Sequence, residues 1–322
     1  MVLWLAEDEV ETALSNNVAE LITALESLYL GNQVWESSPR VRLISPNSSF
    51  QYMGATVPGQ NIMGLKAYAA GRGSGMEGAV MLYDSDRAEL VSVMSCDFLG
   101  RWRTGAVSAL VAKHFSPQKE ISLGLIGTGK QAFTQLGAMA SLGQLASVRA
   151  YSPNQERCKK FSQKASEKFG IEVVAAQSAQ SVAENSNVIS TVTPAKEIVL
   201  QGSWLQAPCL INAVGANRAD QQELEPEILR SAELIIVDDY QQARLECGDL
   251  IKAVELGVVS WDQVVSLKAA LTHLTSNGKD GLTVFESQGL AVWDLVAANI
   301  AYSKCMEMGL GTKVNLRGVG SP

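Results

Sequence analysis

The chain has 322 residues, 47% hydrophobic and 18% charged, a composition that is ordinary for a globular protein of about two domains and excludes a disordered chain. The net charge of −7, with no run of Lys or Arg, excludes the basic surface that binds nucleic acid or an anionic membrane. Five scattered cysteines without a C-x-x-C pair predict buried thiols in a reducing compartment. The N-terminus carries acids where a signal peptide carries basic residues, and no stretch is suited to span a bilayer, so we expect a cytoplasmic protein.

The first third of the chain has the pattern of helices followed by an antiparallel sheet. Residues 4–30 have the apolar spacing of one or two amphipathic helices. Short apolar runs, separated by Gly, Pro, Asn and Asp, then predict about five strands. They cover residues 41–45, 49–53, 63–68, 79–83 and 88–94. A helix follows at residues 99–115, and Pro117 with the polar residues after it marks a domain boundary.

The stretch ISLGLIGTGKQAFTQL at residues 121–136 predicts a strand, a tight turn and a helix. Its turn has the spacing Gly127-x-Gly129-x-x-Ala132 of a dinucleotide-binding βα unit. Gly127 permits the tight turn, Gly129 lets the backbone approach a pyrophosphate, and Ala132 lets the helix pack close to the strand. The free N–H groups of the first helical turn favour a phosphate. The alternative is a glycine turn with a purely structural role.

From residue 121 onward, strands alternate with helices in the order that builds a parallel sheet. We predict helices at residues 131–142, 155–169 and 179–184, and strands at residues 122–127, 148–151, 172–175, 188–192, 210–214 and 234–237. Strands with such crossovers predict a doubly wound Rossmann sheet of order 3-2-1-4-5-6. The chain is completed by helices at residues 241–256 and 262–274, a strand at 282–287 and a long helix at 291–308.

The long C-terminal helix has an apolar face interrupted by charged side chains, so we expect it to pack back on the first domain rather than span a membrane. That domain is then discontinuous. Residues 1–118 plus 291–322 form an α+β domain for substrate binding and dimerisation, and residues 119–290 form the dinucleotide-binding Rossmann domain inserted into it.

The histidines and acids of the chain do not predict a metal site. The only histidines, His114 and His273, each lie near a predicted helix end, without a partner at ligand spacing. Asp238 and Asp239 follow a buried strand, but no further ligands come at useful spacing. We therefore expect chemistry without a bound metal.

Six sequence motifs, in order along the chain, carry a family resemblance. They are RTGAVS from Arg103, GLIGTGKQA from Gly124, STVTPAKEIVL from Ser190, INAVGANRADQQEL from Ile211, DDYQQARLECGDL from Asp238 and VFESQGLAVWDLVAA from Val284. With these motifs the chain resembles the ornithine cyclodeaminase/mu-crystallin family over essentially its whole length. The resemblance implies a homodimer in which the N-terminal α+β domain dimerises and holds the substrate. It also implies that the Rossmann domain binds a nicotinamide cofactor.

The resemblance further assigns three cations to the substrate. They are Arg40 in SSPRVRL, Lys66 in GLKAYA and Arg103 of the RT motif, with Arg42 as an alternative to Arg40 because the register is open there. Three cations around a small site suit a carboxylate, since an arginine guanidinium can donate hydrogen bonds to both carboxylate oxygens. The alternative is that these are surface charges.

The chain departs from the cyclodeaminase pattern within INAVGANRADQQEL. The aspartate that assists proton removal in cyclodeaminases is replaced by Asn217, and an amide cannot act as a general base near neutral pH. Reduction of an imine does not require such a base, because the substrate nitrogen can arrive protonated. Asn217 then need only form a hydrogen bond to the substrate or orient it. The mu-crystallin branch, which also lacks the aspartate, resembles ketimine reductases.

We therefore favour NAD(P)H-dependent reduction of an imino or cyclic ketimine acid to the L-amino acid, with Lys66 and Asn217 as catalytic residues. The substrate would be of the Δ1-pyrroline-2-carboxylate or Δ1-piperideine-2-carboxylate type. The alternatives are an alanine-type amino-acid dehydrogenase, then an ornithine cyclodeaminase, or a non-catalytic NADPH-dependent binding protein of mu-crystallin type. The candidate proton donors are Lys66, Glu77 in SGMEGAV and Asp97 in SCDFLG.

The end of the second Rossmann strand bears on the choice of cofactor. Selection of NAD usually needs an acid there for the ribose 2′-hydroxyl, whereas this chain has Ser152 and Asn154, followed by Arg157. The missing carboxylate favours NADP(H) over NAD(H), and Glu156 is consistent with the first-turn acid of the next helix. Strand ends and family positions together predict cofactor binding by Thr104, Gly127, Thr128, Gly129, Lys130, Gln131, Ser152, Asn154, Arg157, Thr191, Val192, Thr193, Val214, Gly215, Ser287 and Gly289.

Overall fold

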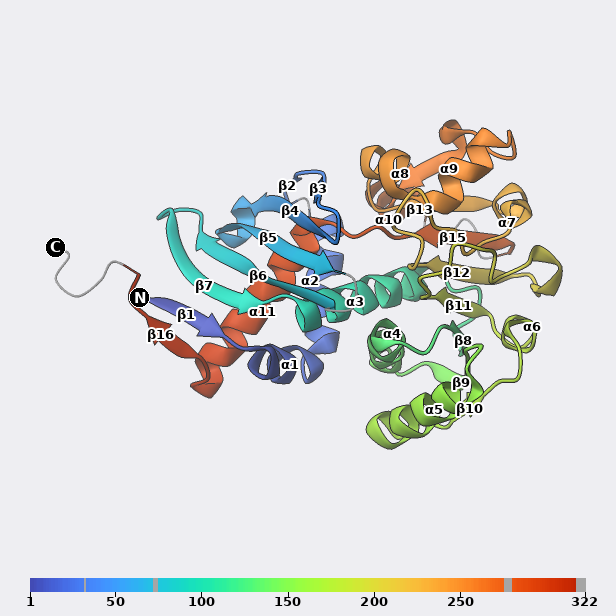
Figure 1. Ribbon diagram of the computed structural model, residues 1–322, viewed down its shortest axis with the longest axis horizontal. Helices are drawn as coiled ribbons and strands as arrows, with labels where there is room; N and C mark the ends of the chain where they lie inside the picture. Colours follow the sequence, from blue (N-terminus) through green and yellow to red (C-terminus); the bar gives the residue numbers. More distant parts are fainter. Residues whose placement is uncertain (32, 72–74, 275–279, 317–322) are drawn as a thin grey trace. The chain divides into compact units, whose positions relative to one another are not determined.

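Contacts divide the chain into two compact units (Figure 1). The computed structural model describes residues 1–31, 33–71, 75–274 and 280–316. Unit 1 comprises Met1–Ala106 and Leu290–Pro322, and unit 2 comprises Val107–Gly289. The first boundary falls inside helix α3 (Asp97–Phe115), earlier than residue 118, where the sequence analysis placed it. Arg103, in the first half of α3, bonds a side chain of unit 1, so this half of the helix belongs with unit 1.

Unit 1 is built on an eight-stranded sheet of order β16-β1-β7-β6-β5-β4-β2, with β3 paired to β4. Its strands are β1 (Val2–Leu5), β2 (Glu36–Ser37), β3 (Val41–Ile44), β4 (Ser48–Val57), β5 (Ile62–Gly71), β6 (Gly75–Asp84), β7 (Glu89–Ser95) and β16 (Thr312–Val314). Strands β3 to β7 pair antiparallel in chain order, which confirms the antiparallel sheet expected from the sequence.

The N-terminus differs from the expected helix. Residues 2–5 form β1, which pairs parallel with β7 and antiparallel with β16, and the first helix begins only at Glu7. The partners of β1 lie at residues 92–94 and 312–314, so its pairing depends on contacts far along the chain. Local spacing does not reveal such contacts, because strand formation depends strongly on its neighbours.

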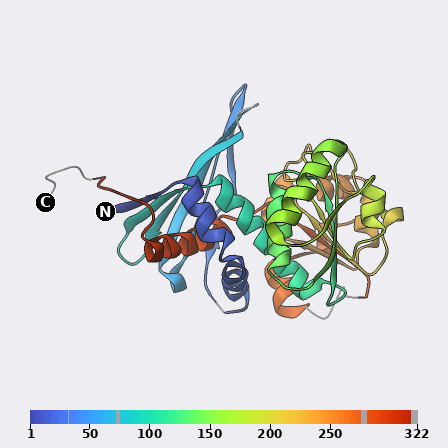
Figure 2. The same cartoon turned by 90° about the horizontal axis from the view of Figure 1, so that it is seen from below.

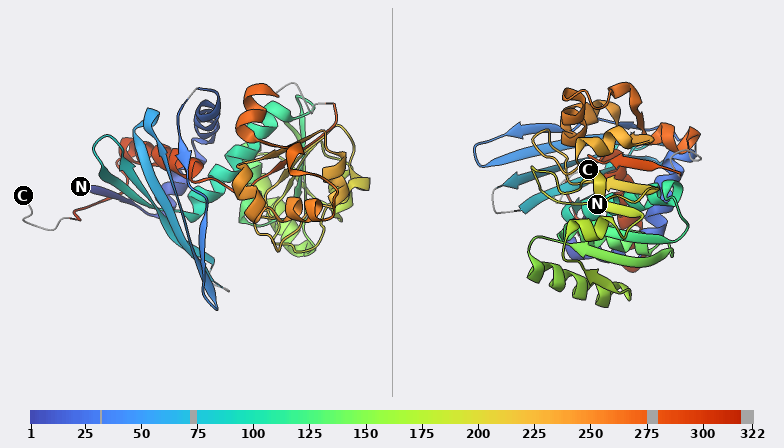
Figure 3. Two further views of the ribbon diagram at one scale, coloured as in Figure 1. Left: turned by 90° about the horizontal axis from the view of Figure 1, so that it is seen from above. Right: turned by 90° about the vertical axis from the view of Figure 1, so that its right-hand side faces the viewer.

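Helices cover one face of the unit 1 sheet. α1 (Glu7–Ser15), α2 (Val18–Leu30) and α11 (Ala291–Met308) lie together on one side of it (Figure 2, Figure 3). α11 contacts β4, β5 and β6. Met53, Lys66, Val80 and Met94 stand opposite one another in the register and are buried on this covered face. Directly opposed residues of paired strands point to the same side of a sheet.

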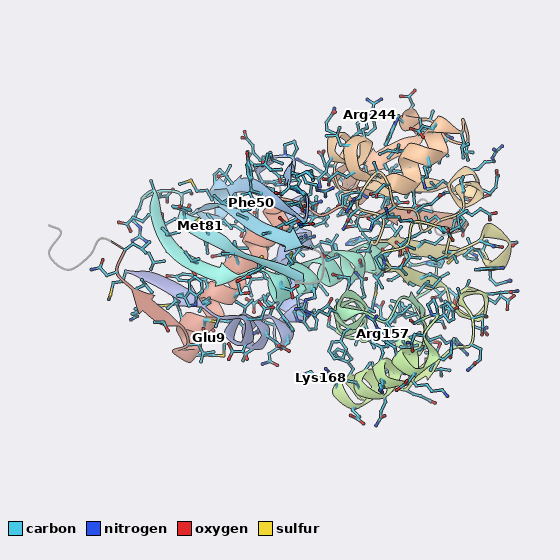
Figure 4. The ribbon with its side chains drawn as sticks, viewed as in Figure 1. Glu9, Phe50, Met81, Arg157, Lys168 and Arg244 are labelled. Carbon is cyan, nitrogen blue, oxygen red and sulfur yellow. The ribbon has the colours of Figure 1, made fainter. Side chains whose placement is uncertain are left out.

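The opposite face of this sheet carries apolar side chains that the described residues leave exposed. The strand register places Trp4, Leu43, Phe50 and Met81 on this face, and Figure 4 labels Phe50 and Met81. The exposed fractions are 48% for Trp4, 55% for Leu43 and 47% for Phe50. An apolar face of this kind is typical of an interaction surface.

Unit 2 is a doubly wound parallel sheet of order β10-β9-β8-β11-β12-β15-β13-β14. Its strands are β8 (Ile121–Ile126), β9 (Leu145–Tyr151), β10 (Val173–Ala175), β11 (Val188–Thr191), β12 (Cys209–Ala213), β13 (Leu234–Val237), β14 (Val264–Ser266) and β15 (Leu282–Glu286). The helices around it (Figure 3) are α4 (Lys130–Ala140), α5 (Gln155–Phe169), α6 (Ala179–Ala183), α7 (Pro226–Ser231), α8 (Tyr240–Glu246), α9 (Gly248–Glu255) and α10 (Leu267–His273). The Rossmann fold class expected from the sequence is confirmed.

The expected strand order is wrong at one edge. The sequence analysis placed the strand at 234–237 beside the strand at 210–214, but β15 lies between β12 and β13. Every residue of β15 is buried, and a buried strand needs a partner on each side to satisfy its backbone groups. β14 lies within the helix expected at 262–274 and pairs with β13 as the last strand.

Local signals fix the ends of α5, which spans the residues predicted for it. Asn154 caps its first turn by accepting the N–H of Arg157 at 2.9 Å, and Gly170 ends it with a φ of 65°. Cys158 and Phe161 are buried at helical spacing. None of the helices in the described part of the chain combines the length with the apolar character that crossing a bilayer requires.

Candidate functional site

The predicted dinucleotide turn lies between β8 and α4. Gly127 has a φ of 113°, and a Cβ there would stand 2.7 Å from the carbonyl oxygen of Val192, so glycine is required. Gly129 is the N-cap of α4, whose first turn carries neither an acidic residue nor a side-chain cap. The N–H groups at the start of a helix favour an anion. The buried hydroxyl of Thr128 has no hydrogen-bond partner among the described residues, which fits a site that a dinucleotide completes.

The residues after β9 that were predicted to select the cofactor differ from one another in their surroundings. Asn154 already has a structural role as the cap of α5. Arg157 is exposed, and its Nη2 lies 3.8 Å from where a Cβ on Gly129 would stand, so a guanidinium lies beside the turn (Figure 4). Ser152 directly follows β9. Glu156 forms an exposed ion pair within α5 and is the first-turn acid that the sequence suggested.

A buried carboxylate that the sequence analysis missed holds the loops after β11 and β12. Glu223 Oε2 accepts hydrogen bonds from the Thr191 hydroxyl and the Gly215 N–H, both at 2.8 Å. Glu223 Oε1 accepts the N–H of Thr193 at 2.7 Å. A Cβ on Gly215 would stand 2.4 Å from Glu223 Oε1, so glycine is needed there. Burial raises the pKa of Glu223, although these donors oppose the rise.

Several predicted cofactor residues meet at the carboxyl ends of neighbouring strands. The N–H of Val192 donates to Ile126 at 2.9 Å, and the N–H of Val214 donates to Thr191 at 3.0 Å. Open α/β sheets bind ligands at this edge. The predicted residues located there are Thr191, Val192, Thr193, Val214 and Gly215, with Lys130 and Gln131 at the start of α4.

Asp238 holds the loop that follows β15. Its Oδ2 accepts the N–H groups of Gln288, at 2.6 Å, and of Gly289, and the Ser287 hydroxyl at 3.3 Å. The N–H of Ser287 donates to Ala213, at the end of β12, at 2.9 Å. The loop with the predicted residues Ser287 and Gly289 is thus fixed beside the end of β12, and Asp238 serves as its anchor.

Two more carboxyl groups are buried behind these loops. Asp249 Oδ1 accepts the N–H groups of Glu223 and Leu224 at 2.9 and 2.8 Å. Burial raises the pKa of Asp249 to about 7. Burial, together with the charge of Asp249, raises the pKa of Glu286 well above its usual value. Within the described ranges, no three His, Cys, Asp or Glu side chains are arranged to hold a metal ion.

In unit 1, two of the predicted substrate residues meet on one carboxylate. Lys66 Nζ, from β5, and Arg103 Nε, from α3, each lie 3.0 Å from Oδ1 of Asp294 on α11. Lys66 is 3% exposed, Arg103 6% and Asp294 0%. We call these three residues the substrate cluster, after the role predicted for Lys66 and Arg103. Asp294 is one of the charged side chains that interrupt the apolar face of the long C-terminal helix, and an acid in such a helix was the available signal.

The substrate cluster holds two cations and one anion. Burial alone would raise the pKa of Asp294, but Arg103 and Lys66 hold that pKa below its usual value, so the carboxylate is ionised. One positive charge therefore remains in a buried place, which favours an anionic ligand. A Cβ on Gly100 would stand 2.6 Å from Lys66 Nζ, so glycine at this position leaves room for the ammonium group.

Arg40 and Arg42 lie at the start of β3. Arg42 stands opposite Gln51, and Gln51 stands opposite Tyr68, so Arg42 shares a sheet face with Lys66, two residues before Tyr68. The Tyr68 hydroxyl donates to Gln51 Oε1 at 2.8 Å. Arg40 directly precedes β3 and is not one of the residues of the substrate cluster.

One of the three candidate proton donors lies on the sheet face opposite Lys66, and a second is paired with an arginine. Glu77 stands opposite Ala69 on β5, on the sheet face that does not carry Lys66. Asp97 accepts the guanidinium of Arg101 at 2.7 Å. Lys66 is the candidate that lies in the cluster.

The remaining predicted site residues are Asn217 and Thr104. Asn217 is half-buried in the loop after β12, and its N–H donates to Gly215 at 2.9 Å. The hydroxyl of Thr104 is buried and donates to the carbonyl oxygen of Gly100 at 2.8 Å. Thr104 therefore already has a hydrogen-bond acceptor within its helix.

Similarity to known proteins extends over most of the chain. An alanine dehydrogenase of Archaeoglobus fulgidus is 30% identical over 328 residues, which cover 97% of this chain and 98% of that protein. The ketimine reductase mu-crystallin of Rattus norvegicus is 34% identical over 227 residues, which cover 70% of this chain and 69% of that protein. A solved structure, Thermococcus litoralis Δ1-pyrroline-2-carboxylate reductase in complex with NADH and L-proline, is 27% identical with a TM-score of 0.87, covering 97% of this chain and 100% of that one.

A family model agrees with these relatives. The model described as the ornithine cyclodeaminase/mu-crystallin family matches residues 1–309. The match includes the dinucleotide turn, the Glu223 loops and the substrate cluster, and it confirms the resemblance carried by the six motifs. The chain therefore belongs to the ornithine cyclodeaminase/mu-crystallin family.

Proposed function

We propose that the protein is a NAD(P)H-dependent oxidoreductase that reduces a cyclic imino acid to the L-amino acid. The substrate is of the Δ1-pyrroline-2-carboxylate or Δ1-piperideine-2-carboxylate type. The observation that carries the proposal is the substrate cluster, in which Lys66 and Arg103 share the single carboxylate of Asp294. A substrate carboxylate neutralises the remaining positive charge. L-Proline, the product of reducing Δ1-pyrroline-2-carboxylate, is a ligand of the Thermococcus litoralis relative.

The chemistry needs one hydride and one proton. The residues of the dinucleotide turn would hold the phosphates of a nicotinamide cofactor, which would supply the hydride to the carbon of the C=N bond. Lys66 and Arg103 bind the carboxylate attached to that carbon, which fixes the orientation of the C=N bond. A substrate nitrogen that arrives unprotonated takes its proton from the Lys66 ammonium, so C=N becomes CH–NH.

Asn217 favours reduction over cyclodeamination. Cyclodeamination begins by oxidising an amine, and this step needs a base to remove a proton. The amide of Asn217 has no titratable proton near neutral pH and cannot act as that base. A substrate that arrives as an imine does not need one.

We infer that the cofactor is NADP(H) rather than NAD(H). Arg157 lies beside the Gly129 turn, and a guanidinium there suits a 2′-phosphate. Ser152 stands where an NAD-selective chain usually carries an acid. An anionic side chain at that position would repel the phosphate, and Ser152 does not.

We also propose a homodimer formed through the open apolar face of the unit 1 sheet. Trp4, Leu43 and Phe50 are about half exposed on this face, and such an area is costly in water unless a partner covers it. A second copy of the chain presents the same face, so a twofold interface is self-complementary.

An alanine-type dehydrogenase is the second candidate. The observation that favours it is the alignment of the Archaeoglobus fulgidus relative with 97% of this chain. The same cations would bind the carboxylate of pyruvate, and the imine would form from pyruvate and ammonia during reduction.

Loss of absorbance in the reduced-nicotinamide band tests the two candidates together. NADPH and NADH are each mixed with the protein and with Δ1-pyrroline-2-carboxylate, Δ1-piperideine-2-carboxylate, or pyruvate plus ammonia. Oxidation with the cyclic imines supports the proposal. Oxidation with pyruvate and ammonia alone moves the function to an amino-acid dehydrogenase. No oxidation despite tight NADPH binding contradicts both and favours a binding protein, and ammonia release from ornithine with catalytic NAD identifies a cyclodeaminase.

A further inference from the structure

We propose that Asp294 is a positioning residue for the substrate carboxylate and acts through Lys66 and Arg103; this inference rests on the proposed substrate site. Its Oδ1 accepts both Lys66 Nζ and Arg103 Nε at 3.0 Å. Because Arg103 gives its Nε to Asp294, the two terminal nitrogens of the guanidinium remain for another carboxylate. Asp294 thus fixes the orientation of the Arg103 guanidinium and of its two terminal nitrogens.

The surroundings of Asp294 argue against a purely structural ion pair. The residue is fully buried in α11, among apolar neighbours such as Val292 and Leu295. A structural pair in such a place needs one cation for each anion, and every charge satisfied. Here a single carboxylate oxygen takes two cations, and Oδ2 has no hydrogen-bond partner within the described part of the chain. The charges of the three residues balance only when another anion joins the cations.

Gly100 offers a second way to test the position of the Lys66 ammonium. A Cβ at this position would lie 2.6 Å from Lys66 Nζ, closer than real Cβ contacts. Gly100 lies inside α3 and does not have a positive φ, so alanine suits its backbone. Gly100→Ala therefore displaces the Lys66 ammonium from Asp294 without disturbing the helix. This variant changes the position of the Lys66 ammonium while Lys66, Arg103 and Asp294 all remain in the chain.

The test compares Asp294→Asn and Gly100→Ala with two matched controls. Asp84→Asn removes an acid from an ion pair with Arg87 at the end of β6, and Gly59→Ala adds a methyl group where nothing lies within 4 Å. The measured quantities are kcat and KM for Δ1-pyrroline-2-carboxylate, the Kd of NADPH and the melting temperature.

We expect kcat to fall about a hundredfold in Asp294→Asn and at least about tenfold in Gly100→Ala, because a misplaced substrate reacts slowly. KM changes less than kcat, since both cations are still present. The Kd of NADPH stays within about twofold in both variants, whereas the melting temperature falls because a buried charge loses its partner. The controls keep both kcat and KM. A loss of kcat with NADPH binding retained does not arise from general unfolding, which would weaken cofactor binding as well.

An unchanged kcat in both variants would overturn the inference, as would a parallel loss of NADPH binding. If the natural chain reduces no imino acid, the proposed function fails, and a titration with L-proline then judges Asp294 separately. The tryptophan fluorescence should respond to L-proline, because the Trp293 ring lies 5.8 Å from the Arg103 guanidinium. A response that both variants lose supports the positioning role, and a response that they retain unchanged contradicts it.

Discussion

Arg103 and Asp294 have different tasks within one ion-paired cluster. In the proposed site, Arg103 offers donors to the substrate, whereas Asp294 is paired with the two cations and does not meet the substrate anion. The two roles can be told apart by kinetics, because loss of a binding group acts mainly on KM and loss of a positioning group acts mainly on kcat.

Arg103→Ala tests the binding task. The variant loses a charge-assisted contact worth about 1.5–3 kcal/mol, so KM for the imino acid should rise about tenfold to a hundredfold. The Kd of NADPH should not change, because the dinucleotide turn belongs to the other unit. Arg101→Ala, which removes a guanidinium paired with Asp97 on the same helix, is the matched control. Equal losses of imino acid and NADPH binding in Arg103→Ala would refute the assignment.

Ser152→Asp tests the choice of cofactor. A carboxylate at the end of β9 repels a 2′-phosphate and can accept the ribose 2′-hydroxyl of NADH. We expect the ratio of kcat/KM with NADPH to kcat/KM with NADH to fall at least about tenfold. Asp in place of Ser147, within the same strand, controls for the added charge. An unchanged ratio would mean that residue 152 does not face the cofactor.

Single residues also show where sequence patterns stop being informative. Gly127 and Gly129 were predictable because the turn fixes their spacing, and Lys66 and Arg103 because they lie in family motifs. Asp294 and Glu223 were not predicted as site residues, since an acid in an apolar helix or in a polar loop does not reveal its partners. Their hydrogen bonds join segments far apart in the chain.

At the scale of elements, the loops after β11 and β12 depend on one carboxylate. Glu223→Gln replaces an acceptor oxygen by an NH2 group that faces a backbone N–H, which costs about 1–3 kcal/mol. The melting temperature should fall by a few degrees, and the Kd of NADPH should rise about tenfold. Glu227→Gln breaks an exposed pair with Arg230 and should alter neither quantity. Normal cofactor affinity in Glu223→Gln would show that these loops do not form the cofactor site.

Elements defined by local signals were predictable, and those defined by pairing partners were not. α5 and α11 have the bounds expected from their caps and apolar spacing. β1 and β14 were assigned to helices, because short apolar runs fit either element until a neighbouring strand is known. The position of β15 between β12 and β13 likewise follows from burial, which spacing along the chain does not encode.

At the scale of the whole molecule, buried carboxyl groups make stability depend on pH. Burial raises the pKa of Asp249 from 3.8 to about 7, so between these values the folded chain holds a proton that the unfolded chain has lost. This contribution to stability is full below the unfolded pKa and disappears as the pH rises to the folded pKa. Burial also raises the pKa values of Glu223 and Glu286, in the same direction.

Asp249→Asn should therefore flatten the fall in unfolding free energy as the pH rises from about 4 to about 7. The asparagine oxygen can still accept the N–H groups of Glu223 and Leu224, so the loop is retained. Urea unfolding across this range gives the slope. Asp220 forms an exposed ion pair that lowers its pKa, so Asp220→Asn should leave the slope between about pH 4 and pH 7 unchanged. A slope in Asp249→Asn as steep as that of the natural chain would contradict the account.

Assembly is the second property at this scale. Phe50→Asp places a charge on the open apolar face and should convert the proposed dimer to a monomer, as measured by light scattering after size exclusion. Leu245→Asp, at an exposed apolar residue of α8 in unit 2, is the matched control and should remain dimeric. A natural chain that is monomeric at micromolar concentration would refute the proposed interface.

The central claim is most directly tested by one rate measurement. NADPH consumption is followed with Δ1-pyrroline-2-carboxylate, and L-proline is quantified in the same mixture, for the natural chain and for Arg103→Ala. We predict one L-proline for each NADPH consumed by the natural chain, and a rate at low substrate that falls at least about tenfold in the variant. No L-proline from the natural chain, or equal rates from both proteins, would contradict the account.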